Sequence, residues 1–387
     1  MTPPHQVPLE QDRVPAIDGM RGLAILLLLL GHWGRNQPGT AFAGWESMAG
    51  HGVVLLLVLT GYIATISLMR DLESGNANSA PTWLRRKALV TYPTLIAALL
   101  AATAIQRWKN GIPVPIERYP GFLSLFGNYY YALAQSDQFR HTLGHLWTLM
   151  VGAQFLIPWV LIMRWAHRAN RVDALLPGLI ALFTVSSGIR WMYSATDLFG
   201  PAYTYLATEG RVADIAVGAL AGLMAWRRRT DGSSRITSFW AAIGSIVLIA
   251  LSLVIPHPGL TPLRLLAMAH LVMWLSARNR SGPWRILDAR PLTLVSLVSY
   301  SAFTWHLYGL DSERLVTGLP WLVRLPFSLT VTLGVAAVAY ATLERPVRRW
   351  VVKPSIGAYN QRPNPPLTPM AFVDLRPQGT RRITRRT

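Results

Sequence analysis

Ten apolar segments, separated by polar or basic connections, make up most of the hydrophobic pattern of this chain. They run over approximately residues 20–34, 52–69, 88–106, 143–163, 174–192, 211–226, 236–255, 262–277, 292–310 and 322–343. Several are shorter than the ~20 residues that a membrane-spanning helix needs, and the fourth has an alternative start near Phe122. The pattern predicts an all-α, polytopic membrane bundle of about ten helices.

Composition supports this interpretation. Of the 387 residues, 51% are hydrophobic and only 14% are charged, against about 25% charged residues in an average soluble protein. No small-residue cleavage site follows the first apolar segment, so we expect it to be retained rather than removed as a signal peptide. The chain contains no cysteine, which excludes disulfides, a thiolate nucleophile and a Cys-ligated metal centre.

The basic residues predict the orientation of the segments. A net charge of +19 would suggest a nucleic-acid partner in a soluble protein, but here Lys and Arg gather in alternate connections, which indicates membrane topology and no nucleic acid. With the N-terminus inside, the richer inner connections carry Arg70, Arg85, Arg86, Lys87, Arg164, Arg168, Arg171, Arg227, Arg228, Arg229, Arg235, Arg278, Arg280, Arg285 and Arg290. The Arg-rich C-terminal tail falls on the same side, so both termini are predicted to be cytoplasmic in a multi-pass protein of the cell membrane.

One domain occupies most of the chain in this interpretation. Residues 1–15 form a polar tail, residues 16–350 the transmembrane domain, and residues 351–387 a Pro- and Arg-rich cytoplasmic tail of disordered composition. We expect the tail arginines to contact anionic membrane lipids. The connection 106–142 is rich in aromatic residues, which is typical of an interfacial or re-entrant segment, and a lid over an acceptor pocket is the alternative.

The first apolar segment contains two ionisable side chains, which are energetically unfavourable in contact with lipid. Arg21 and His32 are separated only by apolar residues and two glycines. On a helix, eleven steps of about 100° bring His32 to within roughly 20° of Arg21, about 16 Å further along the axis. The two side chains therefore share one face, and this face is expected to turn inward, because ionisable groups exposed to lipid cost several kcal/mol.

The motif around this pair resembles the first-helix signature of the acyltransferase-3 family of membrane O-acyltransferases. The residues that match in register are Asp18, Gly19, Arg21, Gly22 and His32. GVVLLLVLTGYI resembles the second-helix pattern of the same family, in which Gly52 and Gly61 match. Val54 stands there in place of an aspartate, and Thr60 in place of a serine.

Later segments extend the resemblance to residue 350. HLWTLMVGAQF is similar to a family motif that contains a glutamate at the position of Gly152. WLRRKALVTYP resembles an arginine-rich helix entry, although Val90 replaces an expected arginine. The other matching residues are His145, Trp147 and Gln154 in the first of these motifs, Arg211 and Asp214 in GRVADIAVGAL, His306 in SYSAFTWHLY, and Glu344 in LERPVRRW.

The resemblance implies ten core helices, a cytosolic acyl-CoA donor, usually acetyl-CoA, and transfer of the acyl group to a hydroxyl of a sugar, a lipid-linked glycan or a natural product. Such a transfer needs a base, and imidazole has an ordinary pKa close to neutrality, about 6.5. We therefore assign His32 as the base, with a transient acyl-histidine as a variant. Arg21 is expected to bind the phosphates or the thioester carbonyl of the donor, and Asp18, one turn earlier, to orient Arg21.

The remaining candidates have supporting roles. Arg85, Arg86 and Lys87 form a second possible phosphate-binding group, although topology alone also explains them. His145 and His306 either complete the cavity around His32 or act as the base themselves. The other residues expected to line or support the cavity are Trp147, Gln154, Arg211, Asp214 and Glu344, and we expect structural ion pairs between Arg211 and Asp214 and between Glu344 and Arg345. We expect no metal and no bound cofactor other than the acyl-CoA co-substrate, because no HxxxH or HExxH spacing occurs.

Two other classes of function stay open at this point. A secondary transporter or flippase for a polar envelope component also needs buried Arg and His side chains, although no internal repeat supports that interpretation. A non-catalytic relative is the other alternative, because Val54 and Gly152 replace two acidic residues of the family pattern.

Overall fold

The apolar segments fold as helices, in which the backbone N–H and C=O groups find their partners within the same segment. A computed structural model describes residues 14–352 except 38–39, 75–78, 112–113, 134–142, 231–238, 256, 258 and 278–282. Within these residues all regular secondary structure is helical and no strand occurs. The predicted all-α fold class is therefore confirmed, while nearly all of both predicted tails lies outside the described residues.

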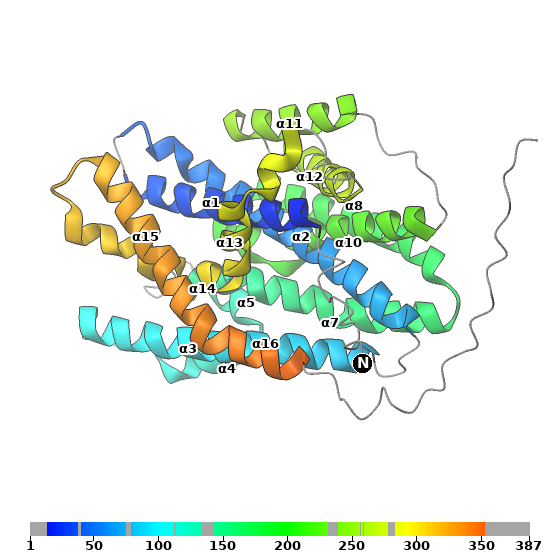
Figure 1. Ribbon diagram of the computed structural model, residues 1–387, viewed down its shortest axis with the longest axis horizontal. Helices are drawn as coiled ribbons and strands as arrows, with labels where there is room; N and C mark the ends of the chain where they lie inside the picture. The colour runs from blue at the N-terminus through cyan, green and yellow to red at the C-terminus, as the bar shows by residue number, and fades with distance from the viewer. Residues whose placement is uncertain are drawn as a thin grey trace, which may run out of the picture. The chain divides into compact units, whose positions relative to one another are not determined.

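The helices follow one another with short connections (Figure 1). They are α1 (Pro15–Arg35), α2 (Glu46–Glu73), α3 (Ser79–Asn110), α4 (Tyr119–Leu123), α5 (Gly127–Leu133), α7 (Trp147–Arg168), α8 (Leu175–Thr196), α9 (Gly200–Leu206), α10 (Thr208–Thr230), α11 (Phe239–Val254), α12 (Leu260–Ser276), α13 (Arg290–Leu297), α14 (Ser299–Leu310), α15 (Trp321–Ala339), the π-turn η7 (Tyr340–Glu344) and α16 (Arg345–Val352). Among the short 3-10 turns, the ones used below are η3 (Gly144–Leu146), η5 (Pro283–Asp288) and η6 (Asp311–Val316).

Six helical segments of the described chain are long and apolar enough to cross a membrane. They are Pro15–Arg35, Ala43–Glu73, Ala80–Trp108, Gly144–Arg168, Val172–Thr196 and Trp321–Trp350. The other predicted segments coincide with α10, with the 16- and 17-residue helices α11 and α12, and with α13 and α14, which meet at Val298. The alternative start of the fourth segment near Phe122 is wrong, because Phe122 lies in the separate helix α4. A count of ten spans and the orientation of the termini stay predictions.

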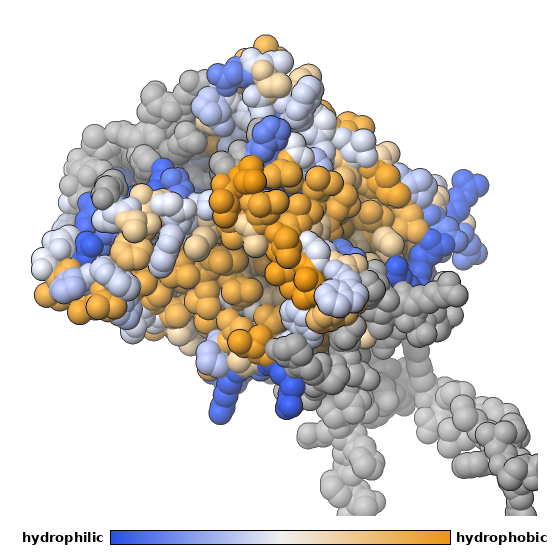
Figure 2. Space-filling model, turned by 90° about the horizontal axis from the view of Figure 1, so that it is seen from above, coloured by the Kyte–Doolittle hydropathy of each residue, from blue (hydrophilic) through white to orange (hydrophobic). Residues whose placement is uncertain are grey.

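The surface of the bundle exposes the apolar side chains expected of a membrane protein. Figure 2 shows a broad apolar surface between hydrophilic residues at the left and right of the face that it presents. Large apolar side chains are exposed on several of the long helices, among them Leu100, Leu161, Val185, Trp191 and Val338. Exposed apolar surface of this kind marks contact with lipid or with a partner, and the six long apolar helices favour lipid.

Glycines allow α1 to pack with its backbone against neighbouring backbone. α1 lies between α2 on one side and η5 and α13 on the other. A Cβ atom added to Gly19 would lie 1.8 Å from the carbonyl oxygen of Leu287, and one added to Gly22 would lie 2.1 Å from that of Leu292. Such distances are far below van der Waals contact, so the two glycines that flank Arg21 fix the depth and rotation of α1 in the bundle.

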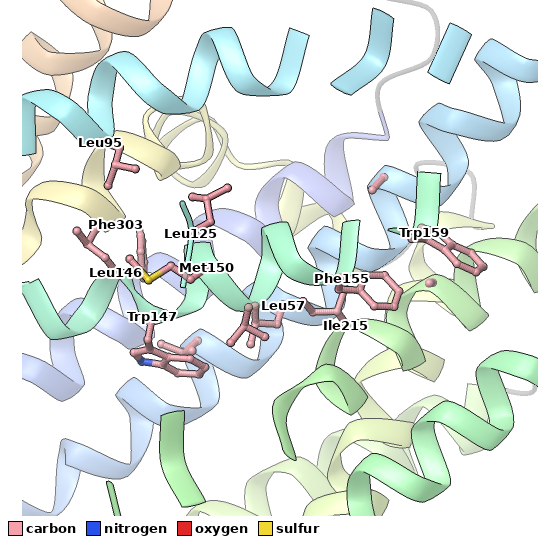
Figure 3. Packing of buried hydrophobic residues seen from close by; sticks show 14 of the residues in the cluster. Leu57, Leu95, Leu125, Leu146, Trp147, Met150, Phe155, Trp159, Ile215 and Phe303 are labelled. Atoms are coloured by element: carbon pink, nitrogen blue, oxygen red, sulfur yellow. The ribbon is translucent and has the colours of Figure 1, made fainter. Parts of the chain in front are cut away.

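Helix α7 supplies much of the buried core. Trp147, Met150, Phe155 and Trp159 recur at helical spacing along it and are at most 5% exposed. Figure 3 shows these side chains spaced along α7, with Leu57 of α2 and Ile215 of α10 near Phe155. The Trp159 indole also donates a hydrogen bond to Thr65 of α2 (3.0 Å), so both apolar contact and a buried hydrogen bond join the two helices.

Glu209, in the first turn of α10, joins the short helices α5 and α9 to the bundle. Its carboxylate accepts hydrogen bonds from the hydroxyls of Tyr129 (2.6 Å), Tyr203 (2.8 Å) and Tyr193 (3.1 Å). Burial alone would raise the pKa of Glu209, but these hydrogen bonds lower it below its ordinary value, and burial raises the pKa of Tyr129 to about 12. The aromatic connection 106–142 therefore packs on α10 through α5, while its residues 112–113 and 134–142 lie outside the described part.

A pair of glycine substitutions tests the packing of α1. We expect Gly22→Ala to destabilise the protein, because the new methyl group has no room beside Leu292. Gly152→Ala on α7 is the matched control: Gly152 is buried, yet an added Cβ meets no atom within 4 Å, so replacing a mid-helix glycine should stabilise the fold by roughly 0.5–1 kcal/mol. Thermal unfolding in detergent measures both, and equal midpoints for the two variants would contradict the close packing.

Candidate active site

Three histidines from different parts of the chain meet at one point in the bundle. His32 lies in the last turn of α1, His145 in the turn η3 just before α7, and His306 in the middle of α14. The ring centroid of His306 lies 4.9 Å from that of His32 and 5.1 Å from that of His145. We refer to these three residues as the histidine cluster.

The hydrogen bonds of the cluster indicate which ring nitrogens carry a proton. Nε2 of His145 lies 3.0 Å from the carbonyl oxygen of Thr304, and Nδ1 of His306 lies 2.6 Å from that of Phe303. A carbonyl oxygen only accepts, so both of these nitrogens are the protonated donors of their rings. The other nitrogens, Nδ1 of His145 and Nε2 of His306, are buried without a hydrogen-bond partner among the described residues. In the neutral rings, both therefore offer lone pairs to a ligand or to a neighbouring imidazolium.

His306 differs from the other two histidines in exposure. It is fully buried, whereas His32 and His145 are partly exposed. Among the described residues, no group of three or more His, Cys, Asp or Glu side chains has an arrangement that could hold a metal ion. Of the three imidazoles, His306 is thus enclosed by the protein, and His32 and His145 keep some exposed surface.

The opposite end of α1 is cationic. The positive charges of Arg21 and Arg348 lie within electrostatic range of the Lys87 ammonium, which in turn lies 5.3 Å from the centre of the Trp83 ring. Arg85 and Arg86, on the same turn of α3 as Lys87, are exposed, and Asp18 precedes Arg21 by one turn. Along α1 this group lies about 16 Å from His32 by helix geometry.

The buried carboxylate of Glu344 belongs to this cationic end, but its partner differs from the predicted one. Arg348, one turn further along, forms the ion pair with Glu344 (3.1 Å), and Ser301 of α14 donates a hydrogen bond to it. The expected pair with Arg345 is wrong, and Arg345 is exposed. Adjacent residues on a helix point about 100° apart, whereas residues four apart share a face.

Gln154 and Trp147 lie beside the histidine cluster rather than in it. The Gln154 amide donates to the carbonyl oxygen of Leu125 (2.5 Å) and to Asn128 (2.9 Å), and it accepts from Thr208 (2.6 Å). These hydrogen bonds connect α7 to α5 and α10, so Gln154 stabilises the packing of these helices.

Trp147 connects the histidine cluster to a second polar centre. Its ring lies 5.3 Å from that of Tyr205 and 4.9 Å from the guanidinium carbon of Arg211. Arg211 forms an ion pair with Asp214 one turn later (3.4 Å), as the sequence suggested, and Arg190 of α8 binds the other carboxylate oxygen at 3.3 Å.

Sequence reasoning missed Arg190 in this centre, together with Arg264 and His51. Arg264 of α12 donates to Nε2 of His51 on α2 at 3.2 Å. The available signal was that all three are ionisable residues within apolar stretches of the chain, where such residues mark functional or paired positions.

The two departures from the acidic positions of the family pattern have different surroundings. Val54 is 2% exposed and packs in an apolar cluster with Ala24 and Leu59. Gly152 is also buried, but the space over its Cα is open. The fold therefore leaves room for a side chain at position 152, whereas the Val54 side chain is closely surrounded by apolar neighbours.

Comparison with known proteins places this architecture in a class. The chain matches the acyltransferase domain family over residues 14–341, and it belongs to that family. Its relatives include the peptidoglycan O-acetyltransferase OatA of Listeria monocytogenes, which is 22% identical over 87% of this chain and 56% of the relative. Another relative is the O-acetyltransferase OatA of Staphylococcus aureus, at 21% identity over 87% of this chain and 57% of the relative. The chain thus spans little more than half the length of these relatives, and no solved structure matches it.

The second polar centre predicts a large difference between two aspartates. Asp214→Asn leaves the buried guanidinium group of Arg211 and the partly buried one of Arg190 without a carboxylate, so we expect the free energy of unfolding to fall by about 3–5 kcal/mol. Asp173→Asn is the control, because Asp173 is 80% exposed and pairs with Arg227 at the surface. We expect that change to cost less than about 1 kcal/mol. Denaturation in detergent compares the two variants, and similar losses would rule out a structural role for the buried pair.

Proposed function

We propose that the chain is a membrane O-acyltransferase that moves an acyl group, most often acetyl, from acyl-CoA to the hydroxyl of a sugar, a lipid-linked glycan or a natural product. The observation that carries the proposal is the histidine cluster, with two unpartnered imidazole nitrogens beside the accessible His32. Family membership supports the acyl-transfer chemistry. The names of the relatives, which are O-acetyltransferases and in one case act on peptidoglycan, favour a glycan acceptor.

In this proposal His32 is the general base. It takes the proton of the acceptor hydroxyl as the oxygen attacks the thioester carbonyl carbon. The new C–O ester bond forms, the C–S bond breaks, and the CoA thiolate leaves and recovers the proton from the His32 imidazolium. The His306 ring lies 4.9 Å from that of His32 and 5.1 Å from that of His145, and these neutral imidazoles stabilise the charge of the His32 imidazolium while it exists.

The donor enters from the cationic end of α1. Arg21, Lys87 and Arg348 bring positive charge together there, and guanidinium and ammonium groups bind phosphates of the kind that CoA carries. The pantetheine arm then extends along α1 for about 16 Å to His32. With both termini cytoplasmic, as the basic connections predict, this cationic end faces the cytosol, and the histidine cluster lies towards the outer side.

A non-catalytic relative is the second candidate, and Gly152 favours it. The open space above Gly152 lacks the carboxylate that the family pattern places there. In the catalytic proposal, water in this space or the cluster imidazoles take its place. In the alternative, the protein turns over no acyl-CoA at all.

Replacement of His32 tests the proposed base directly. We expect His32→Ala to lower kcat by roughly 10²–10⁴-fold, because the hydroxyl then loses its general base. His167→Ala, in the last turn of α7, is the matched control. The measurement is transfer from labelled acetyl-CoA to a peptidoglycan fragment by purified protein with an unchanged melting midpoint. Activity of His32→Ala equal to that of the control would eliminate this role, and no turnover by the wild type would favour the non-catalytic alternative.

Replacement of Arg21 tests the donor side. We expect Arg21→Gln to raise KM for acetyl-CoA by roughly ten- to a hundredfold, as fits the loss of a charge-assisted hydrogen bond, while KM for the acceptor stays unchanged. Arg168→Gln at the exposed end of α7 provides the control. Binding of acetyl-CoA that does not depend on Arg21 contradicts the donor path, and a transporter or flippase predicts no binding of acyl-CoA by either protein.

A further inference from the structure

Three arginines surround a single carboxylate beside the active site. Arg190 of α8 and Arg211 of α10 bind Asp214 at 3.3 and 3.4 Å. The charges of Arg211, Asp214 and Arg264 of α12 all act on Arg190. Asp214 is fully buried and Arg211 is 2% exposed. We refer to these four residues as the arginine cluster.

The positive charge of this cluster is not balanced by the side chains around it. The neighbour of Arg264 is the imidazole of His51, which donates through Nδ1 to Ser47 O (2.8 Å) and accepts through Nε2 from Arg264. The next carboxylate along α10, Glu209, is bound by three tyrosine hydroxyls. Guanidinium groups keep their charge in proteins, so three positive charges share one carboxylate. Buried charge of this kind is costly unless an anion joins it.

A cavity adjoins the cluster. It has a volume of about 220 Å³ and is lined by Ser187 and Arg190 of α8 and by Thr261 and Leu265 of α12. One water needs only ~10–15 Å³ of such space, so the cavity has room for a phosphate or a carboxylate group. Its wall combines the guanidinium group of Arg190 with the hydroxyls of serine and threonine side chains. The buried Nε of Arg264 also has no hydrogen-bond partner among the described residues.

The arginine cluster lies at the same end of the helices as the histidine cluster. The guanidinium of Arg211 stacks on Trp147, which follows His145 by two residues. On the other side, the neighbour of His32, Gly31, packs against Ala49, two residues before His51. The arginine cluster and the histidine cluster are therefore connected through Trp147 on one side and through the contact of α1 with α2 on the other.

We propose that the arginine cluster binds an anionic group, a phosphate or a carboxylate, on the acceptor of the transfer reaction. That the bound anion belongs to the acceptor rests on the proposed function. The existence of an anion-binding site does not. α8 exposes Val185, Trp191 and Met192 next to the cavity, so a lipid headgroup reaches it from the membrane as readily as a soluble anion does. The shared chemistry is an anion with two or more oxygens that face guanidinium groups.

The test uses purified full-length protein in phosphatidylcholine nanodiscs, titrated with inorganic phosphate at constant ionic strength and followed by calorimetry. We expect Arg264→Gln to raise the Kd for phosphate at least tenfold. Asp214 keeps Arg190 and Arg211 in this variant, and Nε2 of His51 keeps its contact with the hydroxyl of Ser252 (2.9 Å), so the fold should persist. Arg314→Gln, which removes an exposed arginine of η6 paired with Asp311, should leave the Kd unchanged.

A second arm identifies the source of the anion. Nanodiscs that also contain phosphatidylglycerol should weaken phosphate binding in the wild type if a lipid headgroup occupies the site, and should leave it unchanged if a soluble anion does. Either result supports the site, provided that Arg264→Gln weakens phosphate binding. Equal phosphate binding by wild type and Arg264→Gln, or none by the wild type, overturns it. If Arg264→Gln does not fold, Arg264→Lys should show an intermediate Kd. Acetyl transfer, measured separately on the same preparations, shows whether the anion site or the proposed function has failed.

Discussion

Ionisable side chains inside an apolar bundle have no water to solvate them, so each must find a partner within the protein or receive one from a ligand. The chain meets this constraint with three polar assemblies, each at least partly buried, near one end of its helices: the histidine cluster, the arginine cluster, and the tyrosines around Glu209. The last is saturated with hydrogen bonds. The other two retain unpartnered nitrogen atoms, and those open positions are where substrates are expected to bind.

Helix α1 sets the geometry between donor and acceptor. Its rigid rise separates Arg21 from His32 by about 16 Å on a single face. The glycines on either side of Arg21 bring it against the backbone of η5 and α13, and Gly31 brings it against α2. The first motif of the chain therefore combines two tasks. Its polar residues supply the proposed chemistry, and its glycines hold those residues in register with the neighbouring helices.

The structure shows different surroundings for Val54 and Gly152, the two positions that depart from the acidic residues of the family pattern. The Val54 side chain packs in an apolar core, so the absence of a carboxylate at this position leaves no cavity. Gly152 leaves open space within the bundle, on the helix whose first turn carries Trp147. A chain with this space and with an arginine-rich centre beside its histidines is suited to an acceptor that brings its own negative charge.

The order of apolar segments was enough to predict an all-α membrane bundle, and helix periodicity alone put Arg21 and His32 on one face and Arg211 within reach of Asp214. These features depend on neighbours within a few turns, which sequence spacing describes well. The meeting of His32, His145 and His306 depends on how three helices rotate and slide against one another, and spacing along the chain contains no such information. The same reason explains why Arg190, Arg264 and His51 were missed, and why the break at Val298 emerged only from the packed structure: each results from contacts between helices that are distant in the chain.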